Sequence, residues 1–392
     1  MATPASTSVS VGDMKVLVLN AGSSSLKFSL TDTARERHLV RGLVERIGEP
    51  GSRLKLDGAV YDVRARDHGE ALQAVLGRLD LEGLEAVGHR VVHGGDFTAA
   101  SLITEEVLER LEAFVPLAPL HNPANIAGIR AALAALPELP QVAVFDTAFH
   151  QTMPERAWRY ALPRELADRH RYRRYGFHGT SHRYVAHRLA ERMGRPIEEL
   201  RLVVLHLGNG ASASAVLHGR SVDTSMGFTP LEGLVMGTRS GDVDPGLVLE
   251  LCRRYGADEA SRILNRESGL QGLAGHADLR DLHAAIAAGD EASRRALEVY
   301  TYRIKKYVGA YAAAMGGLDG LAFTAGVGEN DAEVRARVLE GLEFFGLELD
   351  AEANARGGPR LTRPGSAAEA WVIPTDEELA IARDTERVLR GT

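Results

Sequence analysis

A turn rich in glycine and serine follows the first apolar, strand-like run of the chain. The run 15–19 is apolar after Lys15, and residues 20–27 read Asn-Ala-Gly-Ser-Ser-Ser-Leu-Lys. Glycine and serine let backbone N–H groups and hydroxyls approach phosphoryl oxygens, and a lysine adds a positive charge. Lys27 is one of only five lysines among 46 basic residues. The turn therefore predicts a phosphate-binding segment, with an ordinary Ser/Gly hairpin between two strands as the alternative.

Further short loops combine glycine with arginine, histidine or an acid, a mixture that is typical of anion-binding and catalytic sites. These loops are residues 88–95, 120–123, 145–150, 175–182 and 237–246.

Arg90 and Arg239 each stand in a loop flanked by glycine. A planar guanidinium group suits a carboxylate or a phosphoryl group. The alternative is that each arginine pairs with a structural acid such as Asp242 or Asp244. For Asp244, the following Pro245 favours the N-cap of a helix instead.

His178 lies in a turn before a helix whose apolar face is Val185, Leu189 and Met193. A buried, hydrogen-bonded histidine is the alternative to a catalytic one at this position. His182 lies on the helix itself and is interpreted as structural.

Asp146 ends the apolar run 142–145, where a strand's carboxyl edge faces the ligand crevice of an α/β sheet. A turn-capping aspartate is the alternative at this position.

Strand-like runs alternate with helical patterns along the chain, which predicts an α/β protein. The run 202–207 and its turn 208–214 repeat the plan of the first strand and turn. After a third run at 321–325, the spacing of Val334, Val338 and Leu342 predicts a helix capped by Asn330 or Asp331.

The two similar hairpins indicate a duplicated domain, with one phosphate-binding hairpin from each half facing a shared cleft. The predicted division falls near 150–154, which gives an acid- and phosphate-binding domain at 14–150 and a nucleotide-binding domain at 151–378. A last helix begins at Thr375, where Thr375 and Glu378 have capping-box spacing. Its part from 379 to 392 is expected to return to the first domain, and 1–13 to form a flexible tail.

The composition is that of a globular protein without a nucleic-acid surface. The 392 residues carry a net charge of −7, whereas sequence-independent nucleic-acid binding needs a basic excess. No run of about 18 apolar residues occurs, so membrane insertion is not expected.

The ordered set of loops resembles the acetate and short-chain acid kinase family, within the superfamily of actin, sugar kinases and chaperone ATPases. The resemblance runs from about Met14 to about Arg383 and rests on the segments listed above. It implies two duplicated ribonuclease H-like domains, with mixed sheets flanked by helices around a central cleft. It also implies a cytoplasmic homodimer.

The resemblance assigns catalytic roles to residues of these loops. It implies that Arg90 and Arg239 bind the acid and stabilise the transferring phosphoryl group. It further implies that His178 donates to the phosphoryl group and that His121 is a second active-site histidine. Asp146 is treated as catalytic in the family. Because a small carboxylic acid is already ionised at pH 7, we favour magnesium or water ordering over proton abstraction for Asp146.

The resemblance also implies three sets of binding residues. The acid pocket is lined by apolar residues, namely Val92, Leu120, Phe177 and Pro230. The metal, Mg²⁺ with Mn²⁺ as an alternative, is held by Asn20 and Glu377. Glu377 is available if Glu378 completes the capping box. ATP or ADP is contacted by Ser23, Ser25, Lys27, His206, Leu207, Gly208, Asn209, Gly210, Asp278, Leu279, Arg280, Gly326, Val327, Gly328, Glu329 and Asn330.

The implied activity is reversible, in-line transfer of the γ-phosphoryl group of ATP to acetate, giving acetyl phosphate and ADP. The same family includes kinases of propionate and butyrate, which a substrate panel distinguishes. A sugar kinase fits less well, because a hydroxyl nucleophile needs a base and polar pocket walls. A remote alternative is an actin-like nucleotide switch, whose ATPase would be indifferent to acetate.

Overall fold

The computed structural model describes residues 14–391, so the tail expected at 1–13 lies outside the described residues. The chain forms two compact units. The first contains residues 14–94, Ala99–Phe145 and 377–391, and the second contains Gly95–Thr98 and Asp146–Asp376. The change of unit after Phe145 comes earlier than the expected 150/151. The reason is that the 3₁₀ segment Ala148–Thr152 already packs on elements of the second unit.

The first unit is built on an eight-stranded sheet in the order β5-β4-β3-β2-β1-β6-β8-β7. Its elements are β1 (Lys15–Ala21), β2 (Ser25–Asp32), β3 (Arg37–Glu45), β4 (Arg53–Leu56), β5 (Ala59–Asp62), α1 (His68–Leu76), β6 (Leu84–Val91), β7 (Ser101–Leu102), α2 (Glu105–Ala113), α3 (Asn122–Ala135), β8 (Gln141–Phe145) and α15 (Glu377–Arg390).

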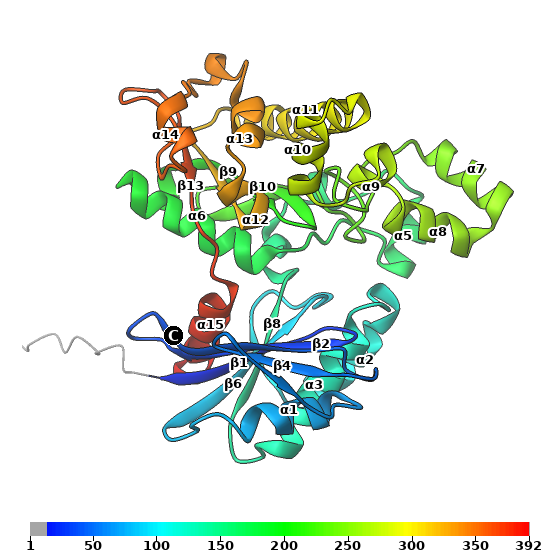
Figure 1. Cartoon of the computed structure of the whole chain (residues 1–392), viewed down its shortest axis with the longest axis vertical. Helices are drawn as coiled ribbons and strands as arrows, with labels where there is room; N and C mark the ends of the chain where they lie inside the picture. Colours follow the sequence, from blue (N-terminus) through cyan, green and yellow to red (C-terminus); the bar gives the residue numbers. More distant parts are fainter. Residues whose placement is uncertain (1–13, 392) are drawn as a thin grey trace, which may run out of the picture. The chain divides into compact units, whose positions relative to one another are not determined.

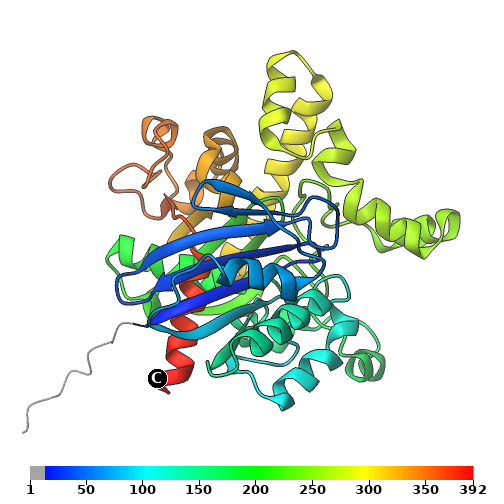
Figure 2. The same cartoon turned by 60° about the horizontal axis from the view of Figure 1, so that its bottom comes forward.

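Strand β1 shows how this sheet is buried on both faces. Val16 and Val18 belong to a core with residues of α15, whereas Leu17 and Leu19 belong to a core with residues of α1 and α3. This alternation follows from the two-residue period of a strand. Figures 1 and 2 show the C-terminal helix α15, in red, beside the blue strands that begin the chain.

The second unit is built on a five-stranded sheet in the order β11-β10-β9-β12-β13, with α6 and α11 packed on its strands. Its elements are α4 (Glu155–Trp158), α5 (Arg164–His170), α6 (Gly179–Met193), β9 (Arg201–Leu207), β10 (Ala211–Leu217), β11 (Arg220–Thr224), α7 (Pro245–Tyr255), α8 (Ala257–Arg266), α9 (Gly269–Ala274), α10 (Leu279–Ala287), α11 (Glu291–Met315), β12 (Gly320–Thr324), α12 (Ala325–Asn330), α13 (Ala332–Leu339), α14 (Ala351–Ala355) and β13 (Glu369–Val372).

The same five-strand plan occurs in both sheets. In the first unit β1, β2 and β3 form an antiparallel meander, and β6 and β8 run parallel on the other side of β1. In the second unit β9, β10 and β11 form the meander, and β12 and β13 are the parallel strands. This repeated order confirms the duplicated architecture of mixed sheets flanked by helices.

Most local predictions for the second half agree with the structure. Helix α6 buries Val185 and Leu189, and Asp331 caps α13 by accepting the Val334 N–H. Residues 325–330, between the predicted strand-like run and the predicted helix, form the short helix α12. No helix among residues 14–391 is long and apolar enough to cross a membrane.

The last helix begins at Glu377, two residues after the predicted Thr375. The Thr375 hydroxyl lies 2.8 Å from that of Ser181, and the Thr375 N–H donates to the Glu329 carboxylate at 3.2 Å. The carboxylate of Glu378 forms an ion pair with Lys27. These contacts, rather than the spacing of Thr375 and Glu378, place the start of α15.

Candidate active site

The hairpin β9–β10 brings Arg239 and His178 against one glycine. A Cβ atom on Gly210 would lie 2.5 Å from Nη2 of Arg239 and 3.5 Å from Cε1 of His178. A side chain at this position would therefore displace the guanidinium group. The turn predicted to bind phosphate in the second half thus lies beside two predicted catalytic residues.

Arg239 has no acidic partner within the described part of the chain. Its Nη1 donates to the Pro230 carbonyl at 2.7 Å, and burial lowers its pKa below the ordinary value for arginine. Asp242 instead accepts from the Gly233 N–H and the Tyr307 hydroxyl, both at 2.8 Å. The structural ion pair considered for Arg239 is therefore absent between residues 14 and 391.

Asp244 accepts from the N–H groups of Gly246 and Leu247 and caps α7, as its position before Pro245 predicts.

His178 is the residue immediately before α6 and has a left-handed backbone, with φ of 56°. Such a conformation is uncommon in a residue other than glycine, and residues with strained backbones cluster at active sites. Nδ1 of His178 lies 2.9 Å from the Ser212 hydroxyl, and its ring stacks on that of His206 with centroids 4.2 Å apart. His206 in turn contacts the Ser181 hydroxyl through Nδ1 at 2.8 Å.

Asp146 follows the last residue of β8 and is 1% exposed. Its carbonyl accepts the N–H of Gly179 at 2.9 Å, and a Cβ on Gly179 would lie 2.2 Å from that carbonyl oxygen. Glycine is therefore required where α6 begins. This contact fixes the start of the helix, and hence His178, relative to the backbone of Asp146.

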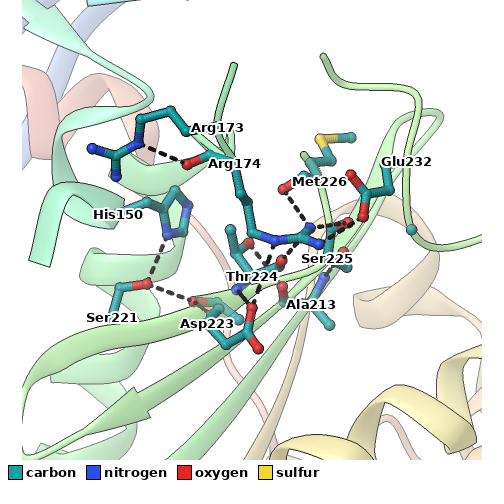
Figure 3. A network of polar contacts seen from close by, with 12 residues as sticks. His150, Arg173, Arg174, Ala213, Ser221, Asp223, Thr224, Ser225, Met226 and Glu232 are labelled. Atoms are coloured by element: carbon teal, nitrogen blue, oxygen red, sulfur yellow. Dashed lines mark hydrogen bonds and ion pairs between the residues drawn. The ribbon is translucent and has the colours of Figure 1, made fainter. Parts of the chain in front are cut away.

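A half-buried arginine, Arg174, holds the segment that carries Pro230. The Nη1 of Arg174 donates to the carbonyls of Thr224, Ser225 and Met226 at 3.0 to 3.2 Å, and its Nη2 donates to Glu232 at 2.6 Å (Figure 3). Because Pro230 lies between these anchors, Arg174 supports the carbonyl to which Arg239 donates. The role of Arg174 was not predicted from the sequence, because its partners lie 50 or more residues away.

The acid-pocket residues predicted in the second unit differ in burial. Phe177 is 2% exposed and its carbonyl lies 3.0 Å from Nε2 of His150, whereas Pro230 is half-buried. Phe177 is thus fixed by packing next to His178.

A cavity of about 1100 Å³ lies in the second unit beside the hairpin turn. This volume is large enough for a nucleotide, since ligand pockets commonly measure about 300–1,000 Å³. The predicted nucleotide residues that line it are Gly208, Asn209, Asp278, Leu279, Arg280, Gly326, Val327 and Asn330.

Other predicted nucleotide residues of the second unit are not among the lining residues of this cavity, namely His206, Leu207, Gly210, Gly328 and Glu329. Glu329 is engaged elsewhere, because its carboxylate accepts from the N–H groups of Ala325 and Thr375. Asp278 caps α10 and binds Arg280, and these hydrogen bonds lower the pKa of Asp278 to about 2.

Part of the cavity wall was not predicted from the sequence. The additional lining residues are Gly237, Leu270, Ala277, His283, Ile286, Ala287, Tyr300, Asp331, Ala332 and Glu333. Ile286 and Ala287 come from the last turn of α10, where an apolar side chain signals burial but not what it is buried against.

In the first unit, Arg90 and Lys27 both face acids at the start of α15. Nε of Arg90 lies 3.8 Å from a carboxylate oxygen of Glu377, and Lys27 pairs with Glu378. Asn20 lies in β1, directly across from Lys27 in β2. Asn20, Lys27 and Arg90 thus lie on the adjoining strands β1, β2 and β6, and Glu377 lies at the start of α15.

Two asparagines of α3 hold the segment after Arg90. The side chain of Asn122 accepts the His93 N–H and donates to the His93 carbonyl, and that of Asn125 accepts the Val92 N–H at 3.0 Å. Asn125 also donates to the Ala21 carbonyl at 2.7 Å. These supports were not predicted, although Asn122 lies in the motif at 120–123 and Asn125 lies two residues after it.

Four other predicted residues of the first unit lie at or near its surface. Ser23 and Ser25 belong to the β1–β2 hairpin, where Ser23 is exposed and Ser25 is half-buried. Leu120 is 67% exposed, and His121 is an exposed residue immediately before α3. Within the described residues of the first unit, no pocket encloses the Leu120 side chain, although Leu120 was predicted to line the acid pocket.

Comparison with known proteins gives a consistent result. A model described as the acetokinase family matches residues 15–383. An acetate kinase of Coprothermobacter proteolyticus is 54% identical over 96% of this chain and 100% of its own, and one of Streptomyces griseus is 55% identical over 95% of each.

Solved structures agree with this. The crystal structure of Porphyromonas gingivalis acetate kinase is 47% identical, covers 96% of this chain and 100% of its own, and superposes with a TM-score of 0.92. The crystal structure of a Francisella tularensis propionate kinase is 41% identical over the same shares, with a TM-score of 0.91.

Proposed function

Since the chain belongs to the acetokinase family, we propose that it transfers the γ-phosphoryl group of ATP reversibly to acetate, giving acetyl phosphate and ADP. The relatives that are about half identical over nearly the whole chain support acetate as the acceptor. The observation that carries the chemistry is Arg239, a largely desolvated guanidinium group with no acidic partner among residues 14–391, beside His178 and the Gly208–Gly210 turn.

Two residues of the second unit stabilise the transferring phosphoryl group. A desolvated guanidinium group attracts equatorial phosphoryl oxygens more strongly than an exposed one, because water screens it less. His178, fixed by its backbone and by Ser212, donates a hydrogen bond to the same group. Catalysis then consists of positioning and charge stabilisation, since the acceptor carboxylate needs no base at neutral pH.

The nucleotide occupies the cavity of the second unit. Its apolar lining from Leu270, Ile286 and Val327 suits the faces of a purine, and Asp278 and Arg280 lie at its polar part. The Gly208–Asn209 turn leads from this cavity toward Arg239 and His178. This arrangement supports a triphosphate that runs along the turn.

In the first unit, Arg90 binds the carboxylate of the acid and Lys27 binds phosphate oxygens. Arg90 faces Glu377 and Lys27 faces Glu378, both at the start of α15. A substrate anion can take the place of the glutamate as the partner of each basic side chain. Val92, fixed by Asn125, adds an apolar contact for the methyl group of the acid.

The donors Asn20 and Glu377 fit a magnesium ion. Mg²⁺ is commonly held by one or two carboxylates, substrate phosphates and several waters, so an amide oxygen and one carboxylate are a suitable protein contribution. No cluster of three or more His, Cys, Asp or Glu side chains that could hold a metal occurs in residues 14–391. When bound, the ion would neutralise charge on the phosphates. In the second unit, Asp146 would order a water. It is 1% exposed, and its backbone carbonyl accepts the Gly179 N–H at the start of α6.

Acid-dependent ADP release tests the proposal. We expect ADP release to require acetate, and hydroxylamine to trap an equimolar amount of acyl phosphate. Propionate should be used less well and butyrate worse. The preference should be partial, because one methylene changes binding in an apolar pocket by about 1–3 kcal/mol. ATP hydrolysis indifferent to acids would refute the proposal, and a clear preference for propionate would favour the activity named for the Francisella relative.

We also propose that the protein acts as a cytoplasmic homodimer. The family resemblance supports this, and the exposed Leu247 and Leu249 on α7 are apolar side chains that a second copy would cover. Light scattering of the purified protein in solution gives the oligomeric state, and a monomer at working concentration would contradict this part of the proposal.

A further inference from the structure

One serine hydroxyl lies between His178, the residue immediately before α6, and His182, in the first turn of that helix. The Ser212 Oγ is 2.9 Å from Nδ1 of His178 and 2.7 Å from Nε2 of His182. Because a ring nitrogen of each histidine lies within hydrogen-bonding distance of this hydroxyl, both rings face β10, the strand that contains Ser212. Ser212 and His182 are both 0% exposed.

The surroundings of Nδ1 of His182 indicate which ring nitrogen of His182 carries the proton. Nδ1 of His182 is buried and has no hydrogen-bond partner among the described residues. Burial lowers the pKa of His182 well below its ordinary value, so the imidazole is neutral and carries one proton. A buried N–H without an acceptor is rarer in proteins than a buried acceptor without a donor. The proton of His182 therefore belongs on Nε2, where the Ser212 oxygen accepts it.

The proton on Nε2 of His182 fixes the direction of the hydrogen bond between Ser212 and His178. Ser212 has one hydroxyl proton, and with its oxygen accepting from His182 that proton points to Nδ1 of His178. Nδ1 of neutral His178 is then an acceptor, so its proton lies on Nε2. If the order were reversed, Ser212 would donate to His182, and neutral His178 would carry its proton on Nδ1.

We propose that His182 and Ser212 are positioning residues that fix the tautomer of His178, so that its Nε2–H is the donor offered to the phosphoryl group. The inference deepens the proposed function and rests on it for the identity of the acceptor. It also revises the sequence-based interpretation of His182 as a purely structural residue. The left-handed backbone of His178 fixes the position of the ring, and the Ser212 hydrogen bond fixes its proton.

The tautomer can be measured directly. Two-bond proton–nitrogen correlation spectra of the full chain labelled with nitrogen-15 histidine distinguish Nε2–H from Nδ1–H imidazoles, and His178→Gln assigns the His178 signals. We expect His178 in the wild type to be the Nε2–H tautomer at neutral pH. In Ser212→Ala we expect a mixture of tautomers. An Nδ1–H tautomer in the wild type overturns the inference without any variant.

Kinetics provide the second readout. Ser212→Ala should lower kcat about tenfold, as expected for weakening one hydrogen-bond donor in the transition state, while the KM values for ATP and acid change less than about twofold. Ser214→Ala is the matched control. It removes a buried hydroxyl two residues further along the same face of β10 whose contacts are Ser221 and the Asp223 carbonyl, so kcat should be unchanged.

Conservative replacement at His182 separates positioning from packing. A glutamine amide can donate to Ser212 in place of the imidazole Nε2–H, so His182→Gln should keep the wild-type tautomer of His178, whereas His182→Leu should lose it. An unchanged tautomer and kcat in Ser212→Ala would refute the inference even if acetate-dependent activity is present. If that activity is absent, the spectra still test the tautomer, so failure of the two proposals can be told apart.

Discussion

Arg239 is the residue on which the proposed chemistry depends most. Its guanidinium group is half-buried, donates to the Pro230 carbonyl and has no acidic partner within residues 14–391. We predict that Arg239→Ala lowers kcat by about 10³–10⁵, the range for arginines at transferring phosphoryl groups. Because no ion pair is lost, the urea midpoint should change little. Steady-state ADP release and urea unfolding provide the two measurements.

Arg253→Ala is the control for this prediction. Arg253 is an exposed arginine of α7 that pairs with Glu250 at 2.6 Å, so its loss should leave kcat unchanged. Near-normal kcat in Arg239→Ala, or a fall equal to that of the control, would remove Arg239 from the reaction.

At this scale the sequence identified residue types but not their partners. The loop 237–246 contains both Arg239 and the acids Asp242 and Asp244, so a local ion pair was a reasonable alternative. It is excluded because Asp242 is engaged by Tyr307 and Arg303 from α11, more than 60 residues away. Such long-range partners leave no local pattern in a single sequence.

Strands and hairpins were the elements best predicted from the sequence. The β9–β10 hairpin follows from an apolar run and a glycine-containing turn, both of which are local signals. The start of α15 and the helix α12 were predicted less well, because they depend on distant contacts. Thr375 is bound by Ser181 and Glu329, and Glu329 also bonds the first residue of α12. The cavity wall likewise contains residues of α10, α11 and α12. No local sequence pattern shows how these helices pack together.

Strand β6 contains a buried histidine that makes the stability of the first unit depend on pH. His89 lies 2.8 Å from the Gln141 side chain on β8, and burial lowers its pKa to about 4. In the unfolded chain a histidine has a pKa of about 6.5. Between these values the unfolded state binds more protons, so stability is full above pH 6.5 and falls as the pH drops toward 4.

This shift predicts a slope of about 1.4 kcal/mol per pH unit from His89 alone below pH 6.5. We expect the free energy of unfolding from urea titrations to be flatter between pH 6.5 and 5 in His89→Gln than in the wild type. The glutamine keeps an amide beside Gln141 but does not titrate. Parallel slopes in the two proteins would show that His89 is not the group responsible.

For the whole molecule, the duplicated sheet order explains why two similar hairpins occur half a chain apart. The sequence predicted the duplication because the strand–turn plan recurs, whereas the bounds of the units needed the structure. The last helix belongs to the first unit although the 230 or so residues before it belong to the second. Ile381 and Ala382 of this helix complete one core of the first unit, where they pack with apolar residues of β1, β6 and β8.

Ile381 tests this dependence of the first unit on the end of the chain. It is 1% exposed and packs with Val16, Val18 and Val142 of the first sheet. The Ile381 side chain packs directly on the backbone of β6, because a Cβ on Gly88 would lie only 2.9 Å from Cγ2 of Ile381. We therefore predict that Ile381→Ala destabilises the first unit by about 2–5 kcal/mol.

Hydrogen exchange followed by mass spectrometry measures this effect separately in each unit. Amides of β1, β6 and β8 should lose protection in Ile381→Ala, while those of β9, β10 and β12 keep it, because α15 packs on strands of the first sheet. Arg383→Ala on the same helix, which removes only a surface ion pair with Glu36, should cost less than about 1 kcal/mol. Equal loss of protection in both sheets would mean that α15 stabilises the molecule as one cooperative body rather than completing the first core.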